Sequence, residues 1–272
     1  MKLKDLSGKL IVKPGQKVDL SKVDPDSTFG IEDKQEGLAI LEKNRTRLDE
    51  LQYVMYAEDR HALLVVVQGM DASGKDGTIR HVFSGVNPQG CRVTSFKTPS
   101  AEELDHDFLW RIHKVVPGRR ELGIFNRSHY EDVLIVRVLN LVPEPVWSKR
   151  YEQINRFEKN LAENDVILLK FYLHIGKEEQ KKRLEERLTD PQKNWKMNLE
   201  DLKIRGRWDD FMKAYEEALT RCSTDWAPWY IIPSDKNWYR NAVISHIIVE
   251  TLESLDMKFP KPDFDPSKVV IP

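Results

Sequence analysis

The sequence predicts an α/β protein with one central, mostly parallel sheet of five strands and helices on both faces. Short apolar segments typical of buried strands alternate with longer segments typical of helices along most of the chain. The first strand, residues 63–67, consists of five consecutive apolar residues and leads directly into a loop with three glycines. Because no linker or internal repeat interrupts this pattern, we expect a single domain.

The charge balance limits the kinds of molecule that the protein is expected to bind, and the cysteine content indicates the redox compartment. The 272 residues include 43 Lys or Arg and 44 Asp or Glu, and the net charge is −1. Such a chain is not drawn as a whole to nucleic acid or to an anionic membrane, so we expect neither as a partner. No apolar run approaches the ~18 residues of a membrane span. Cys91 and Cys222 form no close-spaced metal or redox motif, which favours free thiols in a reducing cytoplasm.

The chain divides into an arm, a domain and a tail. Residues 1–33 lack sustained periodicity and are expected to form an extended arm that lies on the domain. The domain comprises residues 34–258, and residues 259–272 form an irregular, proline-rich tail. Strands are expected at residues 63–67, 91–96, 121–125, 166–173 and 229–233. Helices are expected at residues 34–58, 75–86, 100–112, 145–163, 177–187, 200–221 and 238–255.

Two of these helices carry specific signals. Ser100 and Glu103 form a capping-box pattern at the start of the helix at residues 100–112. The helix at residues 34–58 has an apolar face, which either packs on the domain or pairs with the same helix of another subunit. Its residues are Leu38, Leu41, Leu48, Leu51 and Met55. Packing on the domain is the simpler arrangement, although we also expect a homo-oligomer.

The loop after the first strand has the spacing of a phosphate-binding P-loop, Gly69-x-x-x-x-Gly74-Lys75. In a P-loop, backbone N–H groups hold phosphate oxygens and the lysine neutralises them; a turn that only closes a strand–helix unit is the alternative. Two carboxylates make this loop unusual, because Asp71 lies within it and Asp76 stands where P-loop NTPases place a Ser or Thr on magnesium. Lys75 is the candidate catalytic cation and Asp71 a candidate metal ligand. The other candidate phosphate-binding residues here are Gly69, Ala72, Ser73, Gly74, Asp76 and Gly77.

A second polar cluster, residues 126–132, directly follows the strand at residues 121–125. Ligands bind at the carboxyl ends of strands in open α/β sheets, so we expect this cluster to lie beside the P-loop. Phosphoryl transfer needs cations and a divalent metal on the phosphate oxygens, which makes Arg127 a candidate catalytic cation. Glu131 and Asp132 are the candidate catalytic carboxylates, and Asp132 is expected to hold the metal with Asp71.

The remaining residues of the cluster are candidates for contact with the ligand. They are Asn126, Ser128, His129 and Tyr130. Asn126 is neutral although many P-loop proteins place a carboxylate at the end of this strand. His129 is expected to hydrogen-bond a structural group or the substrate, since no other His or Cys lies at metal-ligand spacing.

The segment from residue 177 to residue 207 is basic, with ten Lys or Arg against seven Asp or Glu, a local excess of 10 − 7 = 3. Such a segment is either a solvated helix face or a mobile lid that closes cations over phosphates and excludes water. Its place between two core strands favours a helical lid at about residues 178–207. The candidate phosphate-binding residues in it are Arg183, Arg187, Lys193 and Lys196.

With these motifs assembled, the chain resembles the polyphosphate kinase 2 family, whose P-loop kinase fold is similar to that of thymidylate kinase. The resemblance extends over about residues 48–259 and rests on the loop at residues 69–77, on residues 125–132 and on the lid pattern. It implies reversible, Mg²⁺-dependent transfer of a terminal phosphoryl group between inorganic polyphosphate and a purine nucleotide, with Mn²⁺ as a possible substitute. Asp71, Lys75 and Arg127 would be catalytic, and Arg183 would hold phosphates.

The family resemblance also bears on the acceptor. Members restricted to nucleoside diphosphates carry Asp where this chain has Asn126, so the motif looks more like the branch that phosphorylates both AMP and ADP, with GMP and GDP as further candidates. Two alternatives stay open: a nucleoside monophosphate kinase with ATP as donor, and a P-loop switch that binds nucleic acid. Formation of ATP or ADP from polyphosphate as the sole donor distinguishes the first expectation from both.

Overall fold

The computed structural model describes residues 6–271 of the chain. Its sheet has five strands, β1 (Ala62–Gly69), β2 (Cys91–Ser95), β3 (Leu122–Asn126), β4 (Val166–His174) and β5 (Trp229–Pro233). The longer helices are α2 (Lys34–Glu58), α3 (Lys75–Val82), α7 (Glu144–Ala162), α8 (Lys177–Thr189), α9 (Leu199–Gly206), α10 (Trp208–Cys222) and α11 (Asn237–Ser254). Short helices are α1 (Leu6–Leu10), α4 (Ala101–Leu104), α5 (Trp110–His113) and α6 (Ile135–Val138), and the 3₁₀ turn η4 (His129–Val133) follows β3.

The strands lie in the order β2-β3-β1-β4-β5, and all four pairings are parallel. The central strand β1 pairs with β3 through Leu63 and Leu122 and with β4 through Leu63 and Ile167. Every residue of β1 is buried, as expected for a parallel strand covered on both faces. The chain continues from β1 to one side of the sheet and later to the other, so the loop after β1 lies at the switch point where such sheets bind ligands.

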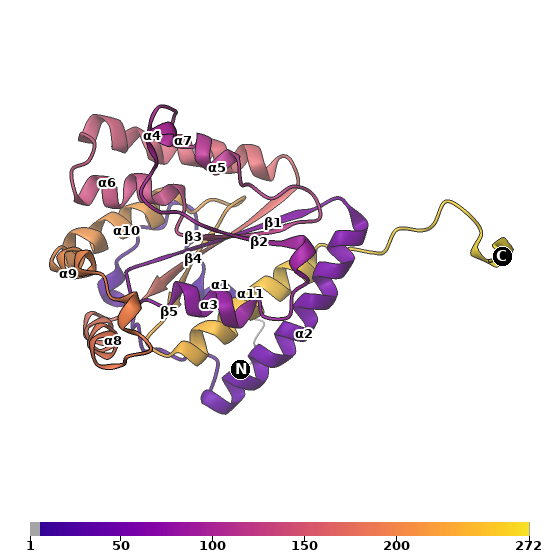
Figure 1. Cartoon of the computed structure of the whole chain (residues 1–272), viewed down its shortest axis with the longest axis horizontal. Helices are drawn as coiled ribbons and strands as arrows, with labels where there is room; N and C mark the ends of the chain where they lie inside the picture. The colour runs from indigo at the N-terminus through magenta and orange to yellow at the C-terminus, as the bar shows by residue number, and fades with distance from the viewer. Residues whose placement is uncertain (1–5, 272) are drawn as a thin grey trace.

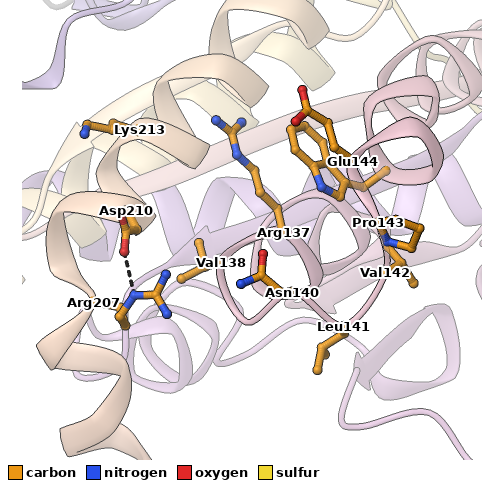
Figure 2. A pocket seen from close by; sticks show the side chains of 11 residues that line it. Arg137, Val138, Asn140, Leu141, Val142, Pro143, Glu144, Arg207, Asp210 and Lys213 are labelled. Carbon is orange, nitrogen blue, oxygen red and sulfur yellow. Dashed lines mark hydrogen bonds and ion pairs between the residues drawn. The ribbon is translucent and has the colours of Figure 1, made fainter.

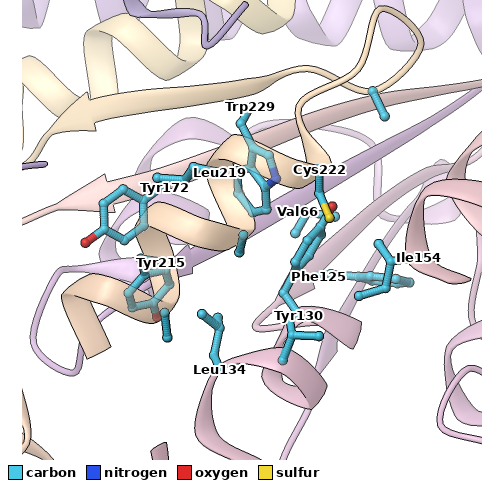
Figure 3. Packing of buried hydrophobic residues seen from close by; sticks show 14 of the residues in the cluster. Val66, Phe125, Tyr130, Leu134, Ile154, Tyr172, Tyr215, Leu219, Cys222 and Trp229 are labelled. Carbon is cyan, nitrogen blue, oxygen red and sulfur yellow. The ribbon is translucent and has the colours of Figure 1, made fainter. Parts of the chain in front are cut away.

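The alternating side chains of β1 belong to two separate cores. Leu64 and Val66 point to a core covered by α6, α7 and α10, where large aromatic rings such as Phe125 and Trp229 fill the space (Figure 3). Leu63, Val65 and Val67 point to the opposite core under α2, α3 and α11 (Figure 1). Burial of apolar surface on both faces stabilises the sheet and fixes its carboxyl edge as a rigid platform.

The helix α2 has the predicted bounds and packs along α11. Asp33 caps it by accepting a hydrogen bond from the N–H of Glu36 over 2.9 Å. The buried face includes Leu41, Leu48, Leu51 and Met55, so this face packs within the chain and not on another subunit. The prediction was wrong for Leu38, which is 47% exposed; the neighbouring Gly37 is buried against the ring of Trp238 instead.

Two predicted helices are each divided. The helix expected at residues 100–112 forms α4 and α5, although the capping box of Ser100 and Glu103 is present; the Asp107 side chain accepts from the N–H of Leu109 between the two helices. The helix expected at residues 200–221 is broken between α9 and α10 at Arg207. Three short elements, α1, α6 and η4, were not predicted from the sequence.

The N-terminal arm covers the edge of the sheet at β5. After α1, Ile11 bridges Tyr230 in antiparallel fashion and the N–H of Val12 donates to the carbonyl of Trp229 over 2.8 Å. Because an uncovered edge strand invites pairing with other chains, the arm protects this edge. The described tail extends away from the domain (Figure 1). In residues 6–271, no helix has the length and hydrophobicity needed to cross a membrane. The division into arm, domain and tail stays a prediction.

Candidate active site

The glycines of the P-loop are required by close contacts and by backbone conformation. Gly69 has φ +154°, and a Cβ at this position would lie 2.7 Å from the Ser73 hydroxyl oxygen and 2.9 Å from the Leu173 carbonyl. Gly74 has φ +101°, and a Cβ there would lie 2.1 Å from a guanidinium nitrogen of Arg240. Only glycine fits both conditions. The loop therefore passes tightly over the end of β4 and over α11 before α3 begins at Lys75.

Lys75 is folded back onto the P-loop. Its Nζ donates to the carbonyl of Gly69 over 2.7 Å and to that of Met70 over 3.1 Å. Burial lowers the pKa of this ammonium, and the neighbouring Arg127 lowers it further. The cation thus lies inside the loop, where phosphate oxygens can replace the carbonyls as its partners.

Arg127 joins the second polar cluster to the P-loop. It follows β3 with φ +62°, and its NH2 donates to Oδ1 of Asp71 over 2.7 Å. Burial lowers the pKa of the guanidinium, but the carboxylates of Glu131 and Asp71 outweigh this effect and hold the pKa above its ordinary value. Glu131 accepts from Gln68 Nε2 over 3.1 Å. Asp71, Arg127 and Glu131 line one small cavity, as the sequence predicted for neighbouring strand ends.

Asp76 and Asn126 meet across the same edge. The Nδ2 group of Asn126, at the end of β3, donates to Oδ1 of Asp76 in the first turn of α3 over 2.7 Å. The carboxylate that replaces the usual Ser or Thr is therefore held by an amide from the second cluster. A carboxylate near a helix N-terminus is also favoured by the helix dipole.

Asp132 is directed away from the P-loop. Its carboxylate lies 2.8 Å from Arg150 NH1 on α7 and 3.9 Å from Arg111 NH2 on α5. Burial raises its pKa to about 6, although both arginines oppose the shift. The structure does not place Asp132 in the cavity with Asp71, which corrects the expectation that these two residues hold one metal ion.

The side chains of Ser128, His129 and Tyr130 have no exposed surface, which corrects the expectation that they contact the ligand. His129 instead makes a structural hydrogen bond, one of the two roles expected for it. His129 Nε2 lies 3.1 Å from Glu158 Oε1, and the Tyr130 hydroxyl donates to the same oxygen over 2.9 Å. Lys170 on the central sheet completes the cluster, with its Nζ 2.5 Å from Glu158 Oε2 and 2.7 Å from the Tyr130 hydroxyl oxygen. Lys170 and His129 hold the pKa of Glu158 below its ordinary value against the effect of burial.

This buried network fixes the turn η4, which carries Glu131 and begins two residues after Arg127. The sequence did not predict it, because Glu158 and Lys170 lie in regular elements far along the chain and carry no motif. A buried network of hydrogen bonds and an ion pair of this kind holds a turn in one position.

Arg183 in the predicted lid donates to protein groups with all of its nitrogens. Nε donates to Glu179 over 2.8 Å, and NH1 donates to the carbonyls of Ala72 and Ser73 over 3.0 and 3.3 Å. NH2 donates to the carbonyls of Ser234 and Asp235 over 2.8 and 2.7 Å. In this conformation Arg183 fastens α8 to the P-loop and does not present free donors to a phosphate, contrary to the expectation.

The other predicted lid cations have partners within the lid segment. Arg187 NH1 lies 3.0 Å from Asp201 Oδ2, which joins α8 to α9. Lys193 pairs with acidic residues of the same segment, and Lys196 lies 5.1 Å from the centre of the exposed Trp195 ring. The structure therefore does not bring Lys193 and Lys196 together with Lys75. A residue that the sequence analysis missed, Gln180, donates to the Asp71 carbonyl over 2.9 Å and thereby also fastens α8 to the loop.

A larger cavity of about 480 Å³ lies between the α6–α7 corner and α10 (Figure 2). Helices α6 and α10 line this cavity and also the small cavity at Asp71, so the two cavities lie near each other beside the same pair of helices. Its polar residues are Arg137, Asn140, Glu144, Arg207, Asp210 and Lys213. Trp147 also lines it, with the Arg137 guanidinium 4.6 Å from its ring centre. The sequence did not indicate this cavity, because its walls come from two distant segments.

The family is decided by a match along most of the chain. Residues 31–260 match the family model described as polyphosphate kinase 2. The chain belongs to the polyphosphate kinase 2 family. This confirms the resemblance seen in the motifs, and the five-stranded parallel sheet confirms the expected P-loop kinase fold.

Relatives within the polyphosphate kinase 2 family are similar over nearly their whole length. An AMP/ADP-polyphosphate phosphotransferase of Meiothermus ruber is 54% identical over 261 residues, covering 96% of this chain and 98% of the relative. An ADP-polyphosphate phosphotransferase of Rhodopseudomonas palustris is 46% identical, covering 92% and 91%. The crystal structure of polyphosphate kinase 2 from Arthrobacter aurescens TC1 superposes with a TM-score of 0.93 at 42% identity, covering 98% of this chain and 94% of that chain.

The donor set of this site fits a divalent metal that is shared with substrate phosphates. Among residues 6–271 no group of three or more His, Cys, Asp or Glu side chains is arranged to hold a metal ion. Arg127 is bonded to Asp71 through Oδ1, and Asp71 and Glu131 line the same cavity. Mg²⁺ in kinase sites is commonly held by one or two carboxylates together with phosphate oxygens, which this donor set can supply.

Proposed function

We propose that the protein transfers the terminal phosphoryl group of inorganic polyphosphate to AMP and ADP, reversibly and with Mg²⁺, for which Mn²⁺ can substitute. The observation that carries the proposal is the pair formed by Arg127 and Asp71 directly over the P-loop, at 2.7 Å. In the proposal, this pair supplies one cation and one metal-binding carboxylate where the two phosphate chains meet. The 54% identity to an AMP/ADP-polyphosphate phosphotransferase supports the choice of acceptors.

In the proposed reaction, a phosphate oxygen of the nucleotide attacks the terminal phosphorus of polyphosphate. The bond from this phosphorus to the bridging oxygen breaks, and the polyphosphate chain leaves one phosphate shorter. The attacking oxygen is already anionic, so the reaction needs no strong general base. The main barrier is the repulsion between two polyanions, which cations in fixed positions reduce.

Three residues have distinct proposed roles. Lys75 exchanges the carbonyls of Gly69 and Met70 for oxygens of the polyphosphate terminus. Arg127 neutralises charge on the transferring group as its pairing with Asp71 is relaxed. Asp71, with Glu131 beside it, holds the metal, which when bound supplies positive charge to oxygens of both substrates.

The 480 Å³ cavity at the α6–α7 corner is the proposed acceptor pocket. It is large enough for a nucleoside and shares its lining helices α6 and α10 with the Asp71 cavity. Arg137, Arg207 and Lys213 provide cations for the nucleotide phosphate, and Trp147 provides an aromatic wall for a base. Closure of the lid formed by α8 and α9 would exclude water from the two phosphates.

The decisive assay supplies AMP, ADP, GMP or GDP separately with Mg²⁺ and polyphosphate and measures the product nucleotides. We expect ADP and ATP from the adenine nucleotides without any other phosphate donor. A parallel series replaces polyphosphate with ATP. Transfer from ATP to AMP combined with no transfer from polyphosphate would contradict the proposal and favour a nucleoside monophosphate kinase.

A further inference from the structure

Arg240 on α11 is a buried cation whose hydrogen-bond acceptors are all uncharged. The residue is 2% exposed. NH1 donates to the carbonyl of Ser73 over 3.0 Å and to Asn237 Oδ1 over 2.7 Å. Nε and NH2 donate to Asn241 Oδ1 over 3.2 and 3.1 Å. The guanidinium is therefore well hydrogen-bonded, but none of these bonds supplies a negative charge.

The electrostatic surroundings make this arrangement costly. Burial lowers the pKa of Arg240 to about 9, and Arg183, a second cation, lowers it as well. A buried charge without a counter-charge is normally avoided, because the interior solvates it poorly. In the other core, beside Tyr130 and Trp229, the buried ammonium of Lys170 does have a carboxylate, Glu158, at 2.5 Å. Among residues 6–271 no carboxylate forms such a pair with Arg240, and this calls for a functional explanation.

The position of Arg240 relative to the P-loop provides that explanation. Its guanidinium lies directly beneath the loop, since a Cβ on Gly74 would be 2.1 Å from NH1 and a Cβ on Gly77 would be 3.5 Å from NH2. In a P-loop the N–H groups of the loop and of the first turn of the following helix face bound phosphates. A phosphate chain on the loop would therefore add strong negative charge close to Arg240.

We propose that Arg240 is a positioning residue whose uncompensated charge, held beneath the P-loop, strengthens binding of the polyphosphate terminus. Arg240 does not touch the substrate. Its guanidinium holds the Ser73 carbonyl by a hydrogen bond and adds positive electrostatic potential at Gly74. The bound phosphates then serve as the counter-charge of Arg240. This role rests on the proposed function, because it requires that the loop binds phosphates. It predicts that an internal carboxylate beside Arg240 would compete with the substrate for this charge.

The central test is Asn241→Asp, which keeps the oxygen that accepts from Arg240 and makes it anionic. Calorimetric titration with inorganic tripolyphosphate measures the affinity, and thermal unfolding without ligand measures stability. We expect binding weaker by about tenfold, the order produced by one unit charge acting through the protein interior. The unliganded protein should be at least as stable as the wild type, because the buried cation gains a partner. The matched control is Asn160→Asp, which adds the same charge on the exposed surface of α7 and should leave the affinity unchanged.

Two further variants separate charge from hydrogen bonding. Arg240→Gln removes the charge and keeps a donor, and we expect tripolyphosphate affinity to fall by about tenfold while the KM for AMP changes by less than about twofold. Arg240→Lys keeps the charge and should remain within about threefold of the wild type. The exposed Arg156→Gln serves as the control for loss of a surface arginine.

The outcomes distinguish this role from the proposed function. Wild-type affinity in both Asn241→Asp and Arg240→Gln would overturn the role of Arg240 alone. Equal losses in Arg240→Gln and Arg240→Lys would show that shape and not charge matters, which would also overturn it. If the wild-type protein neither bound tripolyphosphate nor used polyphosphate, the proposed function would fail first and the role of Arg240 with it.

Discussion

The Nδ2 group of Asn126 donates to Oδ1 of Asp76 over 2.7 Å, and this bond joins the end of β3 to the first turn of α3. It connects the two motifs that identify the family. An amide can make this bond because it offers a donor to a carboxylate; an aspartate at position 126 could not do so while ionised. Asp76 departs from the usual P-loop sequence, and Asn126 is the neutral residue at the end of β3. These two unusual residues are complementary, because the amide of one donates to the carboxylate of the other.

Asn126→Asp should make the stability of the protein depend on pH at this pair. Two carboxylates would face each other, so the folded state would raise the pKa of one above its unfolded value of about 3.9. At low pH the variant would be as stable as the wild type. As the pH rises through the raised pKa, the variant would lose about 1 kcal/mol of unfolding free energy relative to the wild type, a small loss because the site is accessible to solvent. Thermal unfolding between about pH 4 and 7 measures the effect. Asn126→Ala is the control, and an equal pH dependence in the control would contradict the explanation.

Asp71→Ala should abolish phosphoryl transfer while leaving the fold intact. The change removes the partner of Arg127 and the proposed metal-binding oxygens, so we expect the rate to fall by at least about 100-fold. Product ATP from ADP and polyphosphate is the readout, and circular dichroism checks the fold. Asp209→Asn, an exposed residue in the first turn of α10, is the control and should retain its activity. Near-normal ATP formation by Asp71→Ala would refute the assignment.

Glu158→Gln should destabilise the protein strongly, because the ammonium of Lys170 would remain buried without its carboxylate. Breaking such a pair costs about 3–5 kcal/mol of unfolding free energy. Addition of Lys170→Met should restore part of the loss, since the isolated charge is then removed. Urea denaturation measures all three proteins. Glu152→Gln removes an exposed carboxylate on the same helix and should change stability by less than about 0.5 kcal/mol. A double variant less stable than Glu158→Gln would argue against this account.

Gly74→Ala should disturb the P-loop. The backbone has φ +101° here, and the added Cβ would lie 2.1 Å from Arg240 NH1, so strain and a displaced guanidinium are expected together. We predict a loss of about 1–3 kcal/mol in unfolding free energy, together with weaker polyphosphate binding. Gly8→Ala is the matched control, because a Cβ at Gly8 meets nothing within 4 Å. If both alanine variants unfolded at the wild-type temperature, the close contact would have no energetic importance.

Asp132→Asn should remove a pH-dependent part of stability. The pKa of Asp132 is raised to about 6 in the folded protein from its ordinary value of 3.8, so protonation favours the folded state. This contribution is fully present below about pH 4 and is lost as the pH rises through 6. A pKa difference of this size corresponds to about 3 kcal/mol of unfolding free energy. The wild type should therefore gain stability relative to the variant as the pH falls from about 7 to 4, as measured by urea denaturation. A constant difference across this range would show that the arginines keep Asp132 ionised.

The sequence by itself determined the features that depend on short-range pattern. Five apolar residues followed by the P-loop spacing identified β1, the loop and α3, and the polar cluster after residue 125 identified the neighbouring strand end. Such features need only the local periodicity of strands and helices and the special backbone freedom of glycine. The parallel order of the strands then placed Arg127 beside Asp71 without further information.

The tertiary structure decided the direction and the partner of each side chain. Asp132 and Glu131 are adjacent in sequence, yet one is bonded to arginines of α5 and α7 and the other faces Asp71. Arg183 looked like a phosphate ligand, but the carbonyls of the P-loop occupy its donors. Arg240 carried no motif, although it lies beneath the loop from 167 residues away. These contacts depend on which elements pack together, and residue spacing within one segment does not encode them.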